Sequence, residues 1–211
     1  MLDRSRMLLR RQRIAAILTL AGVAFSLVGC DEADSTAIVC AAQPFYTRQD
    51  IATDAGLLGT WQYEAEIRFT FAPGEKNTYD VTIGEDEGQK HFTSKFEGHL
   101  FRLGPDLFLD LYPASVPEGS EFFVLHFFRC HTVMKIELQD NQLQMMFLNP
   151  SWLTQQLKTG AVTLPHASSG DILLLTASTQ ELQELLFLNA NDETAFEEAI
   201  EFVRVNDKEE P

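Results

Sequence analysis

The side chains that could act as bases, nucleophiles or metal ligands are scattered along this chain. None of the five histidines lies in a metal-ligand spacing such as two histidines four apart on a helix. The loop Ser168-Ser169-Gly170 lacks the Gly-x-Ser-x-Gly pattern of a serine nucleophile. The acidic run 85–87 lacks the alternating spacing of a calcium loop. The sequence therefore predicts no enzyme, no metal and no cofactor. The histidines are His91, His99, His126, His131 and His166.

The three cysteines are Cys30, Cys40 and Cys130. Cys30 ends an apolar N-terminal segment, which leaves Cys40 and Cys130 as a pair. In an oxidising compartment the two can form a disulfide. By constraining the unfolded chain, such a bond stabilises the folded protein by up to about 4 kcal/mol. The alternative is two buried free thiols, because cysteine is among the most buried residue types. The neighbouring pair Cys130-His131 is interpreted as a buried structural pair and not as a reactive thiol site.

The N-terminus joins a basic region to a short apolar run. Five arginines, at positions 4, 6, 10, 11 and 13, precede the run 14–28, which is shorter than the ~20 residues of a membrane span. The run ends in Leu27-Val28-Gly29-Cys30, which resembles the lipobox of bacterial lipoproteins. The resemblance implies a signal peptide over 1–29 and a lipid anchor on the Cys30 thiol. The alternatives are an uncleaved signal anchor or an ordinary secretory signal.

An acidic pair, Asp31-Glu32, follows Cys30 directly. It resembles the signal that retains lipoproteins in the inner membrane of some Gram-negative bacteria. The resemblance favours a lipid-anchored protein that faces the periplasm from the inner membrane over one on the outer membrane.

Removal of the signal peptide makes the chain strongly acidic. Residues 1–29 hold five of the 16 basic and one of the 31 acidic residues, which leaves 11 basic and 30 acidic residues and a net charge of −19. Such a surface repels nucleic acid and anionic lipid headgroups. Nucleic-acid binding is therefore excluded, and the expected partners are the membrane through its anchor, an envelope protein or a small apolar ligand.

Composition divides the rest of the chain into three parts. Residues 31 to about 54 are small and polar without a sustained period, so residues 30–56 are predicted to be a lipidated N-terminus and tether. Residues 57–207 are long enough for a single β-rich domain. Residues 208–211 are an acidic tail.

Alternating apolar and polar residues predict most of the domain to be β-strand. The alternation is longest from Thr60 to Phe71, which predicts one half-buried strand, and the pair Asp140-Asn141 predicts a two-residue hairpin. Residues 122–129 hold four phenylalanines on both faces. They predict a strand covered on both sides, or a strand with one face toward a hydrophobic pocket. Seven sequential strands indicate an antiparallel meander.

Helix signals appear after these strands. Asn149 can cap a short helix that ends at Gly160, Ser178 with Glu181 forms a capping box, and residues 191–192 predict a last helix start. Residues 171–176 and 202–205 are typical of strands. The predicted fold class is mostly β with C-terminal helices, with the meander closed into a barrel or left as an open sheet or sandwich with helices on one face.

The segment Leu58-Gly59-Thr60-Trp61 resembles the Gly-x-Trp opening of the first strand in lipocalins and other calycins. The resemblance implies a barrel in which Trp61 plugs one end beneath a basic residue of the last strand, for which Arg204 is the candidate. The late helices and the extra strand depart from a plain lipocalin. The residues assigned to this motif or to a pocket lining are Gly59, Trp61, Tyr63, Phe69, Phe96 and Arg204.

Two functions fit these observations. In the first, the protein is a non-catalytic interaction or accessory lipoprotein whose barrel is packed solid. In the second, it is a binding protein that holds a small apolar ligand in the barrel. The two differ in whether the barrel contains a cavity.

Overall fold

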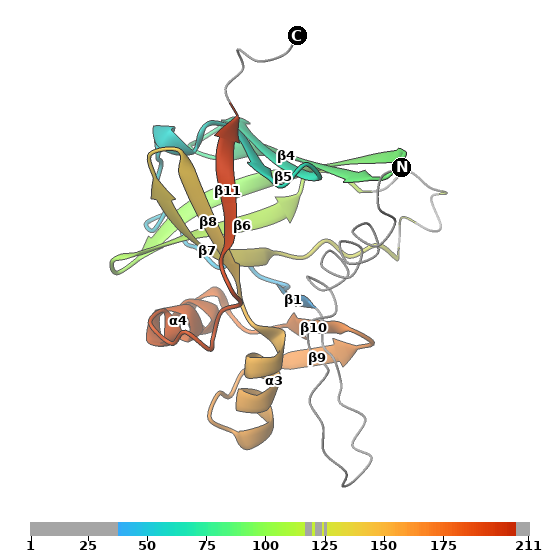
Figure 1. Cartoon of the computed structure of the whole chain (residues 1–211). Coiled ribbons are helices and arrows are strands. Elements are labelled where there is room, and N and C mark those ends of the chain that lie inside the picture. Colours follow the sequence, from blue (N-terminus) through green and yellow to red (C-terminus); the bar gives the residue numbers. More distant parts are fainter. Residues whose placement is uncertain (1–37, 117–119, 121–123, 125, 206–211) are drawn as a thin grey trace, which may run out of the picture.

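The computed structural model describes residues 38–116, 120, 124 and 126–205 (Figure 1). The predicted signal peptide, the lipidation site Cys30, residues 31–37 of the predicted tether and the predicted acidic tail lie outside the described residues. Among the helices within the described ranges, none is both long and apolar enough to cross a bilayer.

Eight antiparallel strands close into a barrel in the order β11-β2-β3-β4-β5-β6-β7-β8. Strands β2 to β8 pair with their neighbours in the chain, and β11 closes the barrel by pairing with both β8 and β2. The predicted mostly β fold with a calycin-like barrel is confirmed, and the open sheet or sandwich is ruled out. The strands are β2 (Gly59–Tyr63), β3 (Ile67–Pro73), β4 (Tyr79–Glu87), β5 (Lys90–Leu103), β6 (Asp106–Pro113), β7 (Thr132–Gln139), β8 (Gln142–Phe147) and β11 (Ile200–Val205).

A second layer packs beneath the barrel in Figure 1. It contains α3 (Pro150–Thr159), α4 (Thr179–Asn189) and a three-stranded sheet in the order β1-β10-β9. The strand β1 (Ile38–Ala41) runs parallel to β10 (Ile172–Leu175), which pairs antiparallel with β9 (His166–Ser169). An isolated antiparallel bridge between Ala41 and His131 joins this small sheet to the start of β7.

The predicted helix ends and the predicted two-residue hairpin are present. Asn149 caps α3, and Gly160 ends that helix in the left-handed conformation at φ 74°. Ser178 and Glu181 form both hydrogen bonds of the capping box at the start of α4. Residues 140–141 connect β7 to β8, with Asp140 at φ 48°.

The single long strand predicted over Thr60–Phe71 is wrong, because the chain reverses at residues 64–66. The hairpin so formed pairs Trp61 with Phe69 and Tyr63 with Ile67. Residues that face each other across an antiparallel pair share one face of the sheet, so both arms keep the alternation that a single strand would have. The pattern alone therefore cannot reveal this turn.

The prediction of a tether is wrong for residues 38–54. Residues 38–41 form β1, and Phe45 is fully buried. Ile51 forms a bridge to Phe101 of β5, and the side chain of Asp54 caps the short 3₁₀ helix η1 (Ala55–Leu57). Nine of the 17 residues of this segment are apolar, and the buried ones among them fix it against the rest of the fold although they follow no sustained period.

Two further predictions are wrong: the strand over residues 122–129 and the helix from residue 191. Phe127 and Phe128 lie outside any strand and are 40% and 61% exposed, so they are neither a covered central strand nor a pocket lining. Phe122 and Phe123, the other two phenylalanines of that segment, lie outside the described residues. The helix predicted from residue 191 is a turn, because the carboxylate of Asp192 accepts hydrogen bonds from the backbone N–H and hydroxyl of Thr194.

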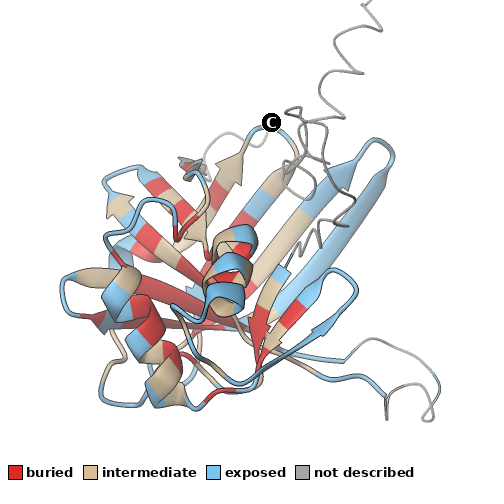
Figure 2. Ribbon diagram, turned by 90° about the horizontal axis from the view of Figure 1, so that it is seen from below, coloured by how far each residue is buried: buried red, intermediate tan, exposed pale blue. Residues whose placement is uncertain are grey.

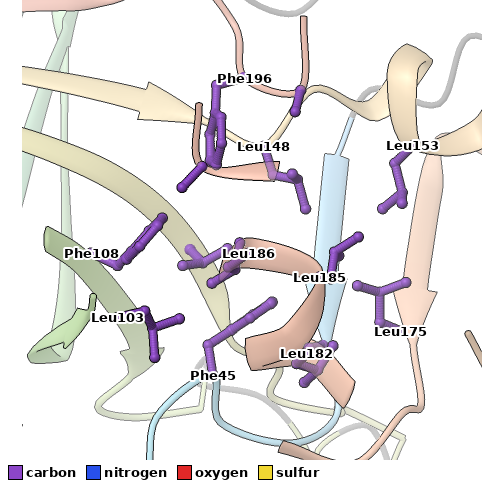
Figure 3. Packing of buried hydrophobic residues seen from close by; sticks show 14 of the residues in the cluster. Phe45, Leu103, Phe108, Leu148, Leu153, Leu175, Leu182, Leu185, Leu186 and Phe196 are labelled. Atoms are coloured by element: carbon purple, nitrogen blue, oxygen red, sulfur yellow. The ribbon is translucent and has the colours of Figure 1, made fainter. Parts of the chain in front are cut away.

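Two apolar cores lie on opposite sides of the barrel wall (Figure 2). The inner core consists of inward side chains from the barrel strands, together with Leu57 of η1. The outer core joins the outside of β5, β6 and β7 to the second layer, where Leu186 of α4 points toward Phe108 and Leu185 lies toward Leu175 (Figure 3). The largest fully buried members of the inner core are Leu57, Trp61, Phe71, Leu100, Leu109, Met134, Leu143 and Met145.

Candidate functional site

One end of the barrel is closed by the residues of the Gly-x-Trp motif. Trp61 is fully buried, and its indole N–H donates to the carbonyl of Leu57 at 2.8 Å. Arg204 of β11 lies opposite Trp61 in the strand register, and its guanidinium carbon is 4.2 Å from the centroid of the indole. The guanidinium also donates to the carbonyls of Leu58, at 2.6 Å, and Gly56. This is the arrangement that the resemblance to calycins implies.

Gly59 is required by this closure. Its φ is +113°, a backbone conformation that L side chains rarely adopt, and a Cβ on it would lie 2.8 Å from Nη1 of Arg204. The glycine of the motif therefore makes room for the arginine that covers the tryptophan.

The predicted pocket-lining residues all belong to the inner core. Phe69 is 6% exposed, and its ring contacts the ring of Phe202 edge-on with centroids 5.2 Å apart. Tyr63 contacts the same Phe202 ring at 5.8 Å, and Phe96 packs against the core while partly buried. These side chains therefore belong to one apolar cluster inside the barrel.

The outer face of the same wall carries a buried carboxylate. Asp110 of β6 is fully buried and lies beside His99 of β5 in the strand register. One oxygen of Asp110 accepts the backbone N–H of Phe45 at 3.0 Å, and the other lies 2.8 Å from Nδ1 of His131. Asp110 thus ties the segment after β1 and the start of β7 to the barrel wall.

Aromatic rings cover both histidines of this outer cluster. The ring of Tyr46 stacks on His99 with centroids 4.1 Å apart, and the ring of Tyr112 stacks on His131 at 4.4 Å. Arg129 lies over the other side of the cluster, with its guanidinium carbon 4.8 Å from the Tyr112 centroid. The imidazoles are consequently held in fixed orientations against the wall.

Burial changes the acidity of two of these groups. Desolvation lowers the pKa of His99, although the charges of Glu97 and Asp110 oppose the shift. Desolvation raises the pKa of Tyr46, and the charges of Asp110 and Glu97 add to that increase. Nε2 of His99 is 3.1 Å from a Glu97 oxygen, whereas its buried Nδ1 has no hydrogen-bond partner. Neutral His99 is therefore the form that the folded protein favours.

The structure brings the predicted cysteine pair together. Cys40 at the end of β1 and Cys130 flank the bridge between Ala41 and His131, and both cysteines are free thiols. Each thiol affects the acidity of the other: the interaction with Cys130 raises the pKa of Cys40, and the interaction with Cys40 lowers the pKa of Cys130 to about 7. The disulfide stays a prediction, and the strand bridge brings the two residues that it requires close together.

The remaining histidines lie away from both regions. His91 pairs with Asp86 at 2.7 Å on the exposed end of the β4–β5 hairpin. His126 and His166 are exposed. Within the ranges that the structure describes, no three His, Cys, Asp or Glu residues are arranged to hold a metal ion.

The sequence interpretation missed Asp110, Tyr46 and the role of His99. The segment Leu107–Tyr112 does contain a signal, because Phe108 lies on the face that should have been wet. A strand that is apolar on both faces is covered on both sides, so a polar residue within it is expected to be buried with a partner. Tyr46 could not have been found in this way, since it lies in the segment interpreted as a tether.

Comparison with known proteins adds no relative: no family model matches the chain, and neither a curated protein nor a solved structure matches it at a significant level.

Proposed function

We propose that this chain is a lipid-anchored envelope protein whose barrel is a packed scaffold for an interaction or accessory role, rather than a carrier of an apolar ligand. One observation carries this proposal. Less than 2% of the surface of each of the largest inner side chains is accessible to a water molecule. A cavity wide enough for a ligand would leave water-accessible surface on its walls. The side chains concerned are Leu57, Trp61, Phe71, Leu100, Leu109, Met134, Leu143 and Met145.

The described fold sharpens the proposed anchoring. β1 begins at Ile38, eight residues after Cys30. Eight extended residues span at most about 28 Å, and a flexible chain of that length spans about 16 Å. A lipid on Cys30 would therefore hold the barrel close to the bilayer rather than at the end of a long tether.

The anchor is tested by labelling cells with a radioactive or clickable fatty acid. We expect the wild-type precursor to incorporate the label and to appear at mature size, and a Cys30→Ala precursor to incorporate none. Labelling of the alanine variant would overturn the assignment of Cys30. For the choice of membrane, an Asp31→Ser variant should move from inner-membrane to outer-membrane fractions, and identical fractionation of both proteins would contradict inner-membrane retention.

The surface offers a candidate contact for a protein partner. Phe187 and Leu188 at the end of α4 are 55% and 69% exposed. Burying neighbouring apolar side chains in an interface is favourable by about 25 cal/mol for each Å² removed from water. The net charge of −19 that remains without residues 1–29 adds attraction toward a cationic protein.

Native mass spectrometry of protein purified from its own cells separates the two functions. We expect no small apolar mass on the chain, together with a co-purifying protein that is weakened by Leu188→Gln. Val203→Thr is the matched control, because Val203 is also more than half exposed but lies on β11. A stoichiometric apolar mass without any protein partner would contradict the packed scaffold.

The ligand-binding alternative has one observation in its favour. Several apolar side chains at the margin of the inner core, including Tyr63, Ile67, Ile83 and Phe96, are only partly buried. A closed barrel with such a margin is compatible with an apolar ligand bound at its end. The mass-spectrometric experiment decides between this position and the packed scaffold.

A further inference from the structure

Two thiols from distant parts of the chain are held close together outside the barrel core. Cys40 is the second-last residue of β1, and Cys130 precedes β7 by two residues. Paired backbone hydrogen bonds of 2.8 and 2.9 Å between the neighbouring residues Ala41 and His131 fix their separation. The thiols are consequently placed by the sheet and not by a flexible loop.

The two sulfurs differ in accessibility. Cys40 is 3% exposed, whereas Cys130 is only partly buried. An external reagent therefore reaches Cys130 first, and the more buried Cys40 lies next to it across the Ala41–His131 bridge. This is the order of a nucleophilic thiol and a resolving thiol.

The surroundings favour the thiolate of Cys130. The interaction with Cys40 is the largest cause of its lowered pKa, and the nearby His131 contributes in the same direction. The imidazole of His131 is held in place by Asp110 and by the ring of Tyr112. A thiol with a pKa near the ambient pH combines a large thiolate fraction with useful nucleophilicity.

The chain just before Cys130 exposes two phenylalanines. Phe127 and Phe128 are 40% and 61% exposed, and Arg129 separates them from the cysteine. Exposed aromatic side chains this close in the chain to a reactive thiol suit a polypeptide better than a small hydrophilic disulfide.

We propose that Cys130 and Cys40 form a redox-active pair that exchanges with a disulfide of a polypeptide partner. The Cys130 thiolate attacks one sulfur of the partner disulfide, so that a mixed disulfide forms and the other partner sulfur leaves as a thiolate. The Cys40 thiol then loses its proton to solvent and attacks the Cys130 sulfur. The internal disulfide forms, and the second partner sulfur leaves. Two electrons pass from the pair to the partner, whose disulfide becomes two thiols.

This inference goes beyond the proposed function and does not depend on the anchor at Cys30. The oxidised pair would join β1 covalently to the start of β7, and the reverse reaction would donate a disulfide to a reduced partner. The direction is set by the compartment and by the partner's potential.

Competitive alkylation of the reduced wild-type chain needs no variant. The full chain, solubilised from membranes, is treated with limiting iodoacetamide, and peptide mapping assigns each adduct to Cys40 or Cys130. We expect Cys130 to react at least tenfold faster than Cys40, with a rate that rises to half its maximum near pH 7. Faster alkylation of Cys40, or equal rates for the two, would overturn the assignment of roles.

An oxidised peptide that contains one disulfide and aromatic residues tests the exchange itself. Wild type should reduce it and finish with an internal disulfide, Cys40→Ser should retain the peptide on Cys130, and Cys130→Ser should react at least tenfold more slowly. Circular dichroism verifies that each variant is folded. If the internal disulfide forms but resists reduction by excess dithiol in the folded protein, the pair is a structural staple and the redox proposal fails.

Discussion

The two faces of the barrel wall at β5 and β6 are built on different principles. On the inner face, Leu100 and Leu109 lie opposite each other and are packed among apolar side chains only. On the outer face, one residue away along each strand, His99 and Asp110 are buried with polar partners. Apolar packing holds the inner face, whereas the outer face combines apolar packing around Phe101 and Phe108 with buried hydrogen bonds. Within the described residues, groups capable of chemistry are therefore concentrated outside the barrel and not in its lumen.

The largest loss is expected on the inner face. Trp61→Ala removes the largest inner side chain and the indole ring that the Arg204 guanidinium covers. The free energy of unfolding should therefore fall by about 4 kcal/mol. Urea denaturation of the variant measures the loss. Trp61→Phe, which keeps most of the volume, should lose much less, and equal losses for the two variants would contradict packing as the cause.

A polar deletion on the outer face should cost slightly less. Asp110→Ala leaves the backbone N–H of Phe45 and the imidazole of His131 without their acceptor, which should lower the free energy of unfolding by about 3 kcal/mol. Hydrogen exchange at the Phe45 amide should also accelerate. Asp110→Asn keeps one acceptor oxygen and should lose less. If Asp110→Leu instead raises the free energy of unfolding, the hydrogen bonds of Asp110 do not stabilise this face.

The closure at the barrel end should contribute an intermediate amount. Arg204→Met keeps the aliphatic stem but removes the cation–π contact and the hydrogen bonds to the carbonyls of Gly56 and Leu58, for an expected loss of about 2 kcal/mol. If the two residues act together, Arg204→Met should cost little more in a Trp61→Ala background. If the two losses are fully additive in that double-mutant cycle, Trp61 and Arg204 stabilise the protein independently of each other.

The smallest effect is a pH dependence from the outer face. The pKa of His99 is lower in the folded protein than its ordinary value of 6.5, so the unfolded chain binds more protons just below pH 6.5. Stability is therefore present above that pH and falls as the pH drops toward the folded pKa. The neighbouring charges and titratable groups are Glu97, Asp110, His131 and Tyr46.

His99→Gln isolates this contribution. The difference in urea midpoint between wild type and variant should move in favour of the variant as the pH falls from 7.5 to 5.5. A difference that does not change with pH would mean that His99 titrates alike in the folded and unfolded chains.

The sequence predicted the inner face better than the outer one. Alternation identified Trp61, Tyr63 and Phe69 as inward, and the Gly-x-Trp motif led to Arg204 before any contact was known. Such features are local in sequence, or follow a recurrent pattern. The turn at Glu64 escaped because a hairpin preserves the alternation of its two arms.

The outer face depends on contacts that no local pattern encodes. Asp110 is 65 residues from Phe45 and 21 from His131. Residues 38–54 show no sustained period and so were interpreted as a tether, yet they cover this face and bring Cys40 close to Cys130. Contacts between such distant segments form only in the complete fold, where the barrel is closed and β1 pairs with β10, so a local sequence pattern cannot predict them.

Packing of the lumen is tested most directly by xenon binding, read from the methionine methyl resonances of the protein that begins at Asp31. Met134 and Met145 report on the inner core, and the partly buried Met146 packs against the outer core and serves as a reference. A dry apolar cavity binds xenon, so Leu143→Ala is the positive control. We predict that xenon shifts the Met134 and Met145 signals in Leu143→Ala and leaves them unchanged in wild type. A saturable shift of either signal in wild type would contradict the packed barrel.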